Sequence, residues 1–255
     1  YQGTGNDFVI LDNRHGLYND LTHTQVHFLC DRRFGIGADG LMLLNLANGL
    51  DFKMVYFNAD GKESTMCGNG GRCLVKFAYH QNIIRTTYHF IAIDGEHEAE
   101  IDEHGLVRLK MQDVTQVEEH HGDVVMDTGS PHYIKDVNNL VDFDVFEKGR
   151  EIRNHAEFLP GGINVNFVEQ LSEDEIMVRT YERGVEDETL SCGTGVTASA
   201  LVHYHNEFGF NDVRVSTRGG RLSVEFERKP DGSYSNIWLC EPAEKVFEGE
   251  IDLPE

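Results

Sequence analysis

The sequence predicts an α/β (α+β) fold made of two pseudo-symmetric domains. One order of segments, namely strand, polar loop, Cys-Gly-x-Gly and helix, occurs twice along the chain. The segments YFNADGKESTMCGNG and TYERGVEDETLSCGTG match around Cys67 and Cys192, and these cysteines are 125 positions apart in a chain of 255 residues. A twofold repeat of this kind predicts two similar domains related by a pseudo-twofold axis.

The first half of the chain alternates strand and helix patterns. Val26, Leu29 and Cys30 form an apolar stripe with helical spacing, and Thr22 precedes it as a candidate cap. Glycines at the start of the Cys67 segment lead into a second stretch that is apolar on one side. In order, the patterns predict a strand at 7–11, a helix at 22–33, a strand at 51–57, a helix at 68–80 and a β meander at 87–111.

The second half repeats this order. Short apolar runs at 165–168 and 175–181 predict strands, and Cys192-Gly-Thr-Gly195 opens a helix. Turn residues then separate a second meander, which the patterns place at 213–217, 221–227 and 236–240.

The polar segment 113–123, QDVTQVEEHHG, is the predicted domain boundary. We therefore expect one domain at 1–115 and the other at 116–245, with 246–255 packing back on the first. In such a pair, corresponding loops would face each other across a cleft, where small-molecule sites commonly form.

Charge excludes several classes of partner. The chain has 44 acidic and 22 basic residues and a net charge of −22. Such a surface repels nucleic-acid phosphates and anionic membranes. No apolar run approaches the roughly 20 residues of a membrane span. We therefore expect a small-molecule ligand, and neither a nucleic-acid nor a membrane partner.

The five cysteines do not form a disulfide or zinc pattern. They are Cys30, Cys67, Cys73, Cys192 and Cys240. Their odd number, their wide separation and the absence of a secretory signal favour reduced thiols in the cytoplasm. Cys67 and Cys73 are too far apart for the tight cysteine pair of a zinc site, so no metal is expected. Cys30, Cys73 and Cys240 lack the glycine-rich context and are predicted to lie in the core.

Two Cys-Gly-x-Gly turns suit proton transfer at a carbon next to a carboxylate. A glycine-rich helix start exposes backbone N–H groups that bind an anion. A cysteine at that position has a stabilised thiolate, with an expected pKa below about 8.5. Two such turns facing each other would hold an α-carboxylate and place one sulfur on each face of the α-carbon. One sulfur could then remove the proton and the other return it, which inverts the stereocentre. No lysine is marked for a Schiff base, so no pyridoxal phosphate or other cofactor is expected.

The simpler interpretation of either cysteine alone is a small buried hydrophobic residue. Two copies in matching places of a repeat favour catalysis instead.

The same residues resemble the diaminopimelate epimerase family. The resemblance runs from end to end and is most specific at Asn58-Ala-Asp-Gly-Lys-Glu-Ser-Thr-Met-Cys67-Gly-Asn-Gly-Gly-Arg72 and at Glu182-Arg183-Gly184 followed by Cys192-Gly-Thr-Gly195. GTGNDF with Asn6, GIGADG at 35–40 and Gly129-Ser-Pro-His132 also look like family segments. The resemblance implies two domains, each a β-barrel-like sheet wrapped around a central helix, and a homodimer.

The resemblance also implies roles for individual residues. Cys67 and Cys192 would be the thiol and thiolate bases, with His132 and Glu182 beside them. The backbone of Gly68, Asn69, Gly193 and Thr194 would hold the α-carboxylate. Asn6, Asn58, Asn164 and Arg183 would contact the substrate, with the Arg183 fork suited to the distal carboxylate. Without the resemblance, these polar residues could equally serve local structure.

Three departures from the family pattern concern substrate recognition. The family commonly has Gln at the position of Gly40 and Asn at that of Ser130, and the loop from Gly184 to Cys192 is one residue longer than usual. The implied reaction is the interconversion of LL- and meso-diaminopimelate in lysine and peptidoglycan precursor biosynthesis. The alternatives are a racemase of another amino acid on the same scaffold and a non-catalytic amino-acid-binding module.

Overall fold

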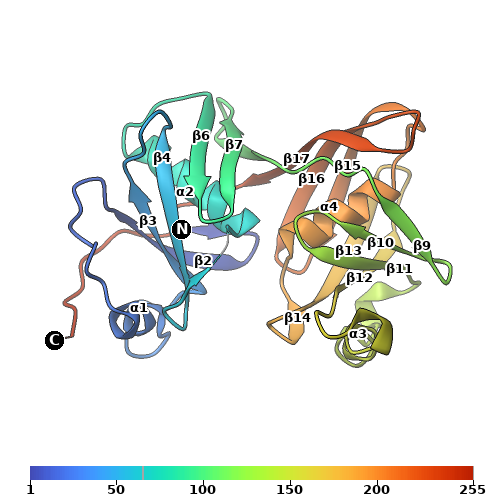
Figure 1. Ribbon diagram of the computed structural model, residues 1–255, viewed down its shortest axis with the longest axis horizontal. Helices are drawn as coiled ribbons and strands as arrows, with labels where there is room; N and C mark the ends of the chain where they lie inside the picture. Colours follow the sequence, from blue (N-terminus) through green and yellow to red (C-terminus); the bar gives the residue numbers. More distant parts are fainter. Residues whose placement is uncertain (65, 255) are drawn as a thin grey trace. The chain divides into compact units, whose positions relative to one another are not determined.

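The computed structural model describes residues 1–64 and 66–254 and divides into two compact units (Figure 1). Unit 1 comprises Tyr1–Leu109 and Glu241–Glu255, and unit 2 comprises Lys110–Cys240. The boundaries between the units, after Leu109 and after Cys240, therefore lie a few residues before the expected boundaries at 115 and 245. Among the described residues, no helix is both long enough and apolar enough to cross a membrane.

Unit 1 is a mixed sheet with a helix packed among its strands. Its strands are β1 (Gln2–Gly3), β2 (Asn6–Asp12), β3 (Gly40–Asn45), β4 (Phe52–Asn58), β5 (Glu63–Ser64), β6 (Thr87–Ala92), β7 (Gly95–Ile101) and β8 (Leu106–Lys110). Helix α2 (Gly68–His80) contacts β1, β2, β3 and β7 and buries Cys73, Leu74 and Phe77 against them. Helix α1 (His23–Cys30) begins at the predicted Thr22 cap, where Thr22 and Gln25 form a reciprocal capping box.

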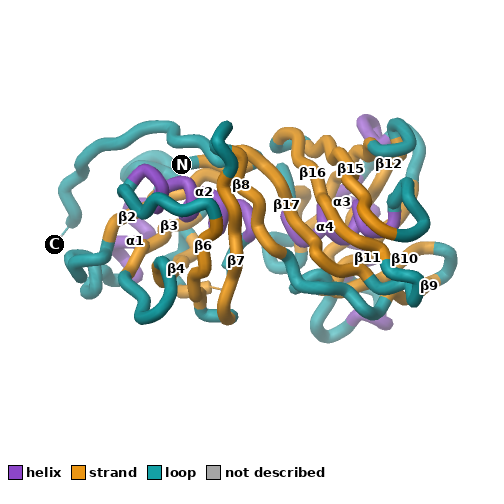
Figure 2. The backbone as a smooth tube through the Cα atoms, turned by 90° about the horizontal axis from the view of Figure 1, so that it is seen from above, coloured by secondary structure: helices purple, strands orange, loops and turns teal. Residues whose placement is uncertain are grey.

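Unit 2 has the same construction around helix α4 (Gly193–Val202). Its strands are β9 (Val117–His120), β10 (Asp123–Asp127), β11 (Pro131–Asp136), β12 (Asn164–Gln170), β13 (Glu175–Glu182), β14 (Asp187–Thr189), β15 (Gly209–Thr217), β16 (Gly220–Arg228) and β17 (Tyr234–Pro242), whose last two residues belong to unit 1. Its other helices are η1 (Leu140–Asp142), α3 (Val145–Arg153) and η2 (Ala156–Phe158). Helix α4 contacts β10, β11, β12, β13, β15 and β16, and Figure 2 shows it among the strands of its unit.

Strand pairing confirms the predicted internal repeat. In unit 1, β2 pairs with β3 in parallel, β3 with β4 antiparallel, and β4 with β6 in parallel. In unit 2, β11 pairs with β12 in parallel, β12 with β13 antiparallel, and β13 with β15 in parallel. Helix α1 follows β2 as α3 follows β11, and α2 follows β5 as α4 follows β14. The predicted α/β fold of two similar domains is therefore correct.

The segment 113–123 is not a linker. It lies within unit 2, where β9 pairs antiparallel with β10 through a two-residue turn at His121 and Gly122. Both turn residues have positive φ, 54° and 88°, as the type I′ turn of a tight hairpin requires. Main-chain hydrogen bonds form whatever the side chains are, so a polar, charged segment can still be an edge strand.

Candidate active site

Cys67 and Cys192 occupy equivalent positions at the N-terminal ends of α2 and α4. Each is the N-cap residue of its helix, with extended backbone, and each is partly buried. The first intrahelical hydrogen bonds run from Gly71 N to Cys67 O (2.7 Å) and from Val196 N to Cys192 O (2.8 Å). The N–H groups of the residues between have no acceptor within the helix. Each unit therefore places a thiol beside a helix end that can bind a carboxylate.

A buried chain of polar side chains leads to Cys192 in unit 2. Thr180 Oγ1 donates to Asn166 Oδ1 (2.9 Å), and Asn166 Nδ2 lies 3.0 Å from His132 Nδ1. His132 Nε2 is 2.9 Å from Thr194 Oγ1, which is 3.5 Å from Cys192 Sγ. His132 and Asn166 are fully buried.

The direction of this chain follows from one carbonyl group. Asn166 Nδ2 also donates to the Tyr133 carbonyl oxygen (3.1 Å), which can only accept, so the amide orientation is determined. The same Nδ2 must then donate to His132 Nδ1, which leaves the ring proton on Nε2. Thr194 Oγ1 accepts that proton, so its own hydroxyl proton is available to Cys192 Sγ.

His132 is a neutral hydrogen-bond donor in this arrangement. Burial lowers the pKa of His132 to about 3, and the charge of Arg183 acts in the same direction. An imidazole with so low a pKa remains neutral at neutral pH. It can orient and polarise Thr194, but it carries no positive charge to the site.

Gly195 allows α4 to approach this chain. A Cβ at Gly195 would lie 2.3 Å from Asn166 Oδ1 and 3.2 Å from His132 Cε1. Contacts this short do not occur for a real side chain without a shift of the buried amide. In unit 2, the second glycine of the Cys-Gly-x-Gly motif is therefore required because any side chain there would clash with Asn166.

The equivalent positions in unit 1 are apolar. His132 pairs with Asn164 as Phe8 pairs with Gly40, so Phe8 is the counterpart of His132. In the same register, Met42 is the counterpart of Asn166. A Cβ at Gly70 would accordingly meet Met42 Sδ at 3.3 Å and Phe8 Cζ at 3.5 Å. Phe8 and Met42 have no proton to donate, so the two helix ends have the same geometry and different chemistry.

Unit 1 instead fixes Asn69 through a separate network. Asn69 Nδ2 donates to Asn6 Oδ1 (2.7 Å), and Asn6 Nδ2 donates to Asp39 Oδ2 (2.8 Å). Arg72 Nη2 donates to Asn69 Oδ1 (2.7 Å), and the fully buried Arg72 forms an ion pair with the equally buried Glu241. These contacts hold the start of α2 in place and direct the Asn69 side chain into the protein.

Asn164, Ser130 and Arg183 form one group in unit 2. Asn164 Nδ2 donates to Ser130 Oγ (2.9 Å), and Asn164 Oδ1 accepts from the Arg183 backbone N–H (2.9 Å). Arg183 Nη2 donates to the same Ser130 hydroxyl at 3.2 Å. Ser130, one of the expected departures from the family pattern, therefore contacts both candidate substrate residues.

The remaining candidates lie at strand ends. Glu182 ends β13, where burial raises the pKa of its carboxyl and a contact with the Thr189 hydroxyl opposes that rise. Asn58 ends β4, is exposed, and lies opposite Gly40. A Cβ at Gly40 would lie 2.5 Å from Tyr56 Cε2, so the Tyr56 ring fills the space that a larger residue at position 40 would need.

The other three cysteines lie in the core, as predicted. Cys30, Cys73 and Cys240 are at most 4% exposed. Burial raises the pKa of the Cys30 thiol to about 11 and that of the Cys73 thiol to about 12. These two thiols are therefore poor nucleophiles at neutral pH.

Three side chains of the polar chain were missed by the sequence reasoning. Asn166 and Thr180 were not considered, and Thr194 was expected to act only through its backbone. The available signal was Asn166 within the apolar run around Val165, because a buried polar residue requires hydrogen-bond partners.

The family model and the similar curated proteins point to the same family. The diaminopimelate epimerase family model matches residues 1–117 and 124–235. The diaminopimelate epimerase of Flavobacterium psychrophilum is 49% identical over 252 residues, with 98% of each chain covered. That of Chlorobaculum tepidum is 47% identical and covers 98% of this chain and 99% of its own.

Solved structures with low sequence identity share the fold. A phenazine biosynthesis protein of the PhzF family from Bacillus anthracis has a TM-score of 0.71 at 15% identity, covering 95% of this chain and 92% of its own. A probable proline racemase from Agrobacterium radiobacter has a TM-score of 0.64 at 15% identity, covering 91% and 81%.

Proposed function

Because the chain belongs to the diaminopimelate epimerase family and is therefore an isomerase, we propose that it interconverts LL- and meso-diaminopimelate. The reaction inverts one α-carbon without a cofactor, in lysine and peptidoglycan precursor biosynthesis. The observation that carries the proposal is the pair of cysteines at the N-terminal ends of α2 and α4, each in the same position of a repeated unit.

Cys67 and Cys192 are the two bases of this reaction. One thiolate removes the α-proton from one face while the other thiol donates a proton to the opposite face. The N–H groups of Gly68, Asn69, Gly193 and Thr194 bind the α-carboxylate, and their dipoles stabilise the charge that develops beside it.

The resting thiolate belongs to Cys192. Its sulfur lies at the end of the donor chain from His132 through Thr194, and a hydrogen bond to a charged group favours the charged form. The matching positions in unit 1 are Phe8 and Met42, which cannot supply such a donor. The reaction needs one thiol opposite one thiolate, so Cys67 begins as the thiol in this proposal. Glu182, whose pKa is raised by burial, supports the exchange of protons.

Arg183 binds the distal carboxylate of the substrate. Its guanidinium is oriented by Ser130, and its backbone N–H is held by Asn164. The Asn6, Asn58 and Asn164 amides bind the second, zwitterionic end of the substrate. This set favours diaminopimelate over an amino acid with an apolar side chain, because an apolar side chain offers no hydrogen-bonding or charged partner to these polar groups.

The deciding experiment is proton NMR of LL-diaminopimelate with the reduced enzyme in D₂O. We expect loss of the α-proton signal and appearance of the meso isomer. Cys67→Ala and Cys192→Ala should abolish both, because each removes one base. Cys30→Ala serves as the matched control and should retain activity, since Cys30 is the last residue of α1 and packs in the core.

Two outcomes would redirect the proposal. If diaminopimelate were unchanged while another amino acid exchanged its α-proton, the cysteine mechanism would stand and the substrate would be wrong. If no amino acid exchanged, a binding module would be the better account. A homodimer and a cytoplasmic location remain predictions, and light scattering of the purified protein tests the first.

A further inference from the structure

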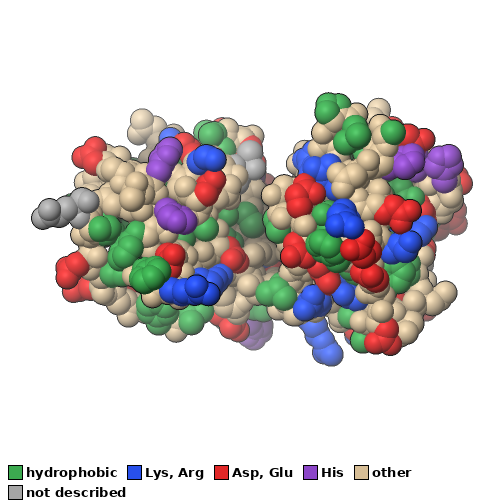
Figure 3. Space-filling model, turned by 90° about the horizontal axis from the view of Figure 1, so that it is seen from below, with side chains coloured by type: hydrophobic (Ala, Val, Ile, Leu, Met, Phe, Trp, Pro, Cys, Tyr) green, Lys and Arg blue, Asp and Glu red, His purple; other side chains and the backbone are tan. Residues whose placement is uncertain are grey.

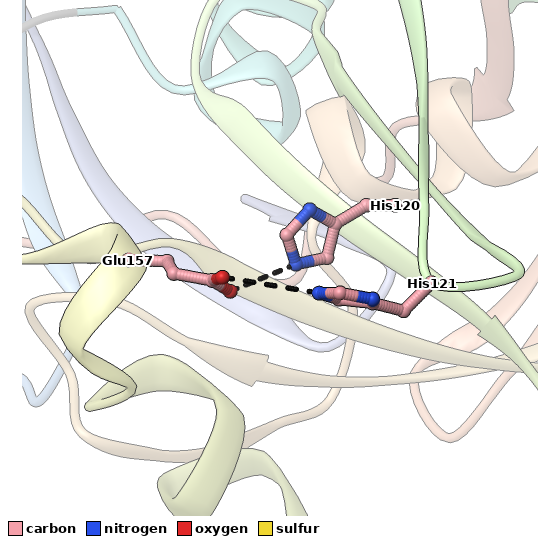
Figure 4. A group of neighbouring side chains, drawn as sticks. All are labelled: His120, His121 and Glu157. Atoms are coloured by element: carbon pink, nitrogen blue, oxygen red, sulfur yellow. Dashed lines mark ion pairs between the residues drawn. The ribbon is translucent and has the colours of Figure 1, made fainter.

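Three imidazoles surround one carboxylate on the surface of unit 2. His120 Nε2 lies 3.1 Å from Glu157 Oε2, and His121 Nε2 lies 3.8 Å from Glu157 Oε1 (Figure 4). The ligand atoms of these three residues are all within 4.8 Å of one another. A third imidazole contacts the same carboxylate, because His155 Nδ1 is 3.2 Å from Glu157 Oε2.

Two separate segments build this cluster. His120 ends β9, and His121 is the first residue of the turn to β10, whereas Glu157 belongs to η2. The His120 ring packs against Tyr133 and Phe158, with centroid distances of 5.9 and 5.4 Å. The ring is thus held with its Nε2 towards the carboxylate, and the positive φ of His121 turns the second imidazole to the same side.

The donor atoms have the type and spacing of a transition-metal site. Imidazole nitrogen and carboxylate oxygen bind Zn²⁺ at about 2.0–2.2 Å, which places tetrahedral ligands about 3.3 Å apart. The observed separations of 3.1 and 3.8 Å lie on either side of that value. Hard cations such as Mg²⁺ prefer a shell of oxygen ligands, which two histidines do not supply.

We propose that His120, His121 and Glu157 bind a zinc ion that clamps the β9–β10 hairpin to the η2 segment. His155 contacts the Glu157 carboxylate from outside the ligand set and orients it, and water completes the tetrahedron. The ion is bound in a structural role, because it links two segments that are 36 positions apart in sequence at His121 and Glu157.

Two further observations support a zinc site that is specific to this chain and not part of the family pattern. The family model leaves residues 118–123 unmatched, so the histidine pair is not part of the family pattern. The net charge is −22, and acidic side chains are spread over the surface of both units (Figure 3). Such a surface raises the local concentration of divalent cations.

The test is calorimetric titration of Zn²⁺ into chelator-treated full-length protein. Every protein in the series carries Cys67→Ser and Cys192→Ser, because partly buried thiols also bind zinc. We expect one site in this background, and affinity at least about tenfold weaker after His121→Ala or Glu157→Gln. His155→Ala should weaken binding by about tenfold, as loss of a residue that orients a metal ligand does.

His104→Ala is the matched control, since His104 is an exposed imidazole beside a single carboxylate, Glu103, at 3.7 Å. It should leave zinc affinity unchanged. Zinc should also raise the thermal unfolding midpoint of the protein with the two serine substitutions, but not that of its His121→Ala variant. Mg²⁺ should leave both midpoints unchanged. Circular dichroism verifies that each variant is folded. Equal affinity in His121→Ala and its parent, or no zinc binding in the serine background, would overturn the proposal.

Discussion

Thr194 is the residue at which the buried polar chain of unit 2 meets the sulfur of Cys192. Its backbone belongs to the helix end, and its hydroxyl accepts from His132 Nε2. The tautomer of His132 depends in turn on Asn166, whose amide is oriented by the Tyr133 carbonyl. The orientation of the Thr194 hydroxyl therefore depends on the His132 ring, the Asn166 amide and the Tyr133 carbonyl group. This hydroxyl is the group that contacts the proposed base, Cys192.

Replacing this hydroxyl gives the first prediction. Thr194→Val keeps the side-chain shape and the backbone N–H, and it removes the donor to Cys192. A hydrogen bond to a charged group contributes about 1.5–3 kcal/mol, so we expect kcat to fall roughly 10- to 100-fold. Because the thiolate is less stabilised, the acid limb of the pH–rate profile should move to higher pH.

Thr194→Ser is the control for this prediction, because serine retains the hydroxyl. It should restore the wild-type pH profile. A purely structural role for Thr194 would lower the rate in both variants without moving the acid limb, and that result would contradict the hydrogen-bond chain.

The same residues show what a sequence can and cannot reveal about a site. The position of Cys67 and Cys192 at the starts of two helices was predictable, because each lies in a specific motif and the motif is repeated. The polar chain was not, because Asn166 and Thr180 become neighbours only when β12 pairs with β13. The amides of Asn6 and Asn164 were expected at the substrate, and their hydrogen bonds to Asp39 and Ser130 depend on packing that no local pattern encodes.

At the scale of elements, α2 and α4 each have a glycine as their third residue, Gly70 and Gly195. The space available for a side chain differs between these two positions. A methyl group at Gly195 would overlap Asn166 Oδ1 at 2.3 Å, whereas one at Gly70 meets the flexible Met42 side chain at 3.3 Å. Helix α4 can therefore approach β12 only without a side chain there. Helix α2 has more tolerance, because methionine adapts to small changes in packing.

Paired alanine substitutions test this difference. Gly195→Ala should shift Asn166 and His132, lower kcat at least about tenfold and destabilise unit 2 by roughly 1–3 kcal/mol, as overpacking of a core does. Gly70→Ala should change the stability by less than about 1 kcal/mol, because alanine also favours a helix over glycine. Urea unfolding and the D₂O exchange assay measure both effects. Equal losses in the two variants would contradict the steric argument.

Helices α1, α2 and α4 were predictable from their apolar spacing and their starts, whereas α3 was not. The α3 sequence, VFEKGREIR, has a central glycine that disfavours a helix. Gly149 is there because a Cβ would lie 2.3 Å from the Cβ of Tyr181. Contact with β13 thus stabilises a helix that its local sequence does not predict. The same holds for β9, whose polar residues form a strand because β10 supplies the hydrogen-bond partners.

At the scale of the whole molecule, the chain repeats one topology with unequal chemistry. Each unit pairs its strands in the same pattern and presents a cysteine at the start of its helix. The structural neighbours at 15% identity show that this fold is shared by proteins with other names, so the fold alone does not define the reaction. The residues that differ between the units, such as Phe8 and His132, are the ones to which we attribute the proposed separate roles of the two cysteines.

The proposed two-base reaction requires both sulfurs to reach a single carbon. This requirement leads to the last prediction, which concerns oxidation. Two thiols close enough to flank one α-carbon can form a disulfide when no substrate separates them. Mild oxidant should therefore abolish epimerase activity, and a thiol reductant should restore it. A variant lacking Cys30, Cys73 and Cys240 should remain equally sensitive, because the raised pKa values of Cys30 and Cys73 leave little thiolate to oxidise in the wild type. If sensitivity disappeared in that variant, the core cysteines would be responsible, and the two proposed bases would not approach each other as the reaction requires.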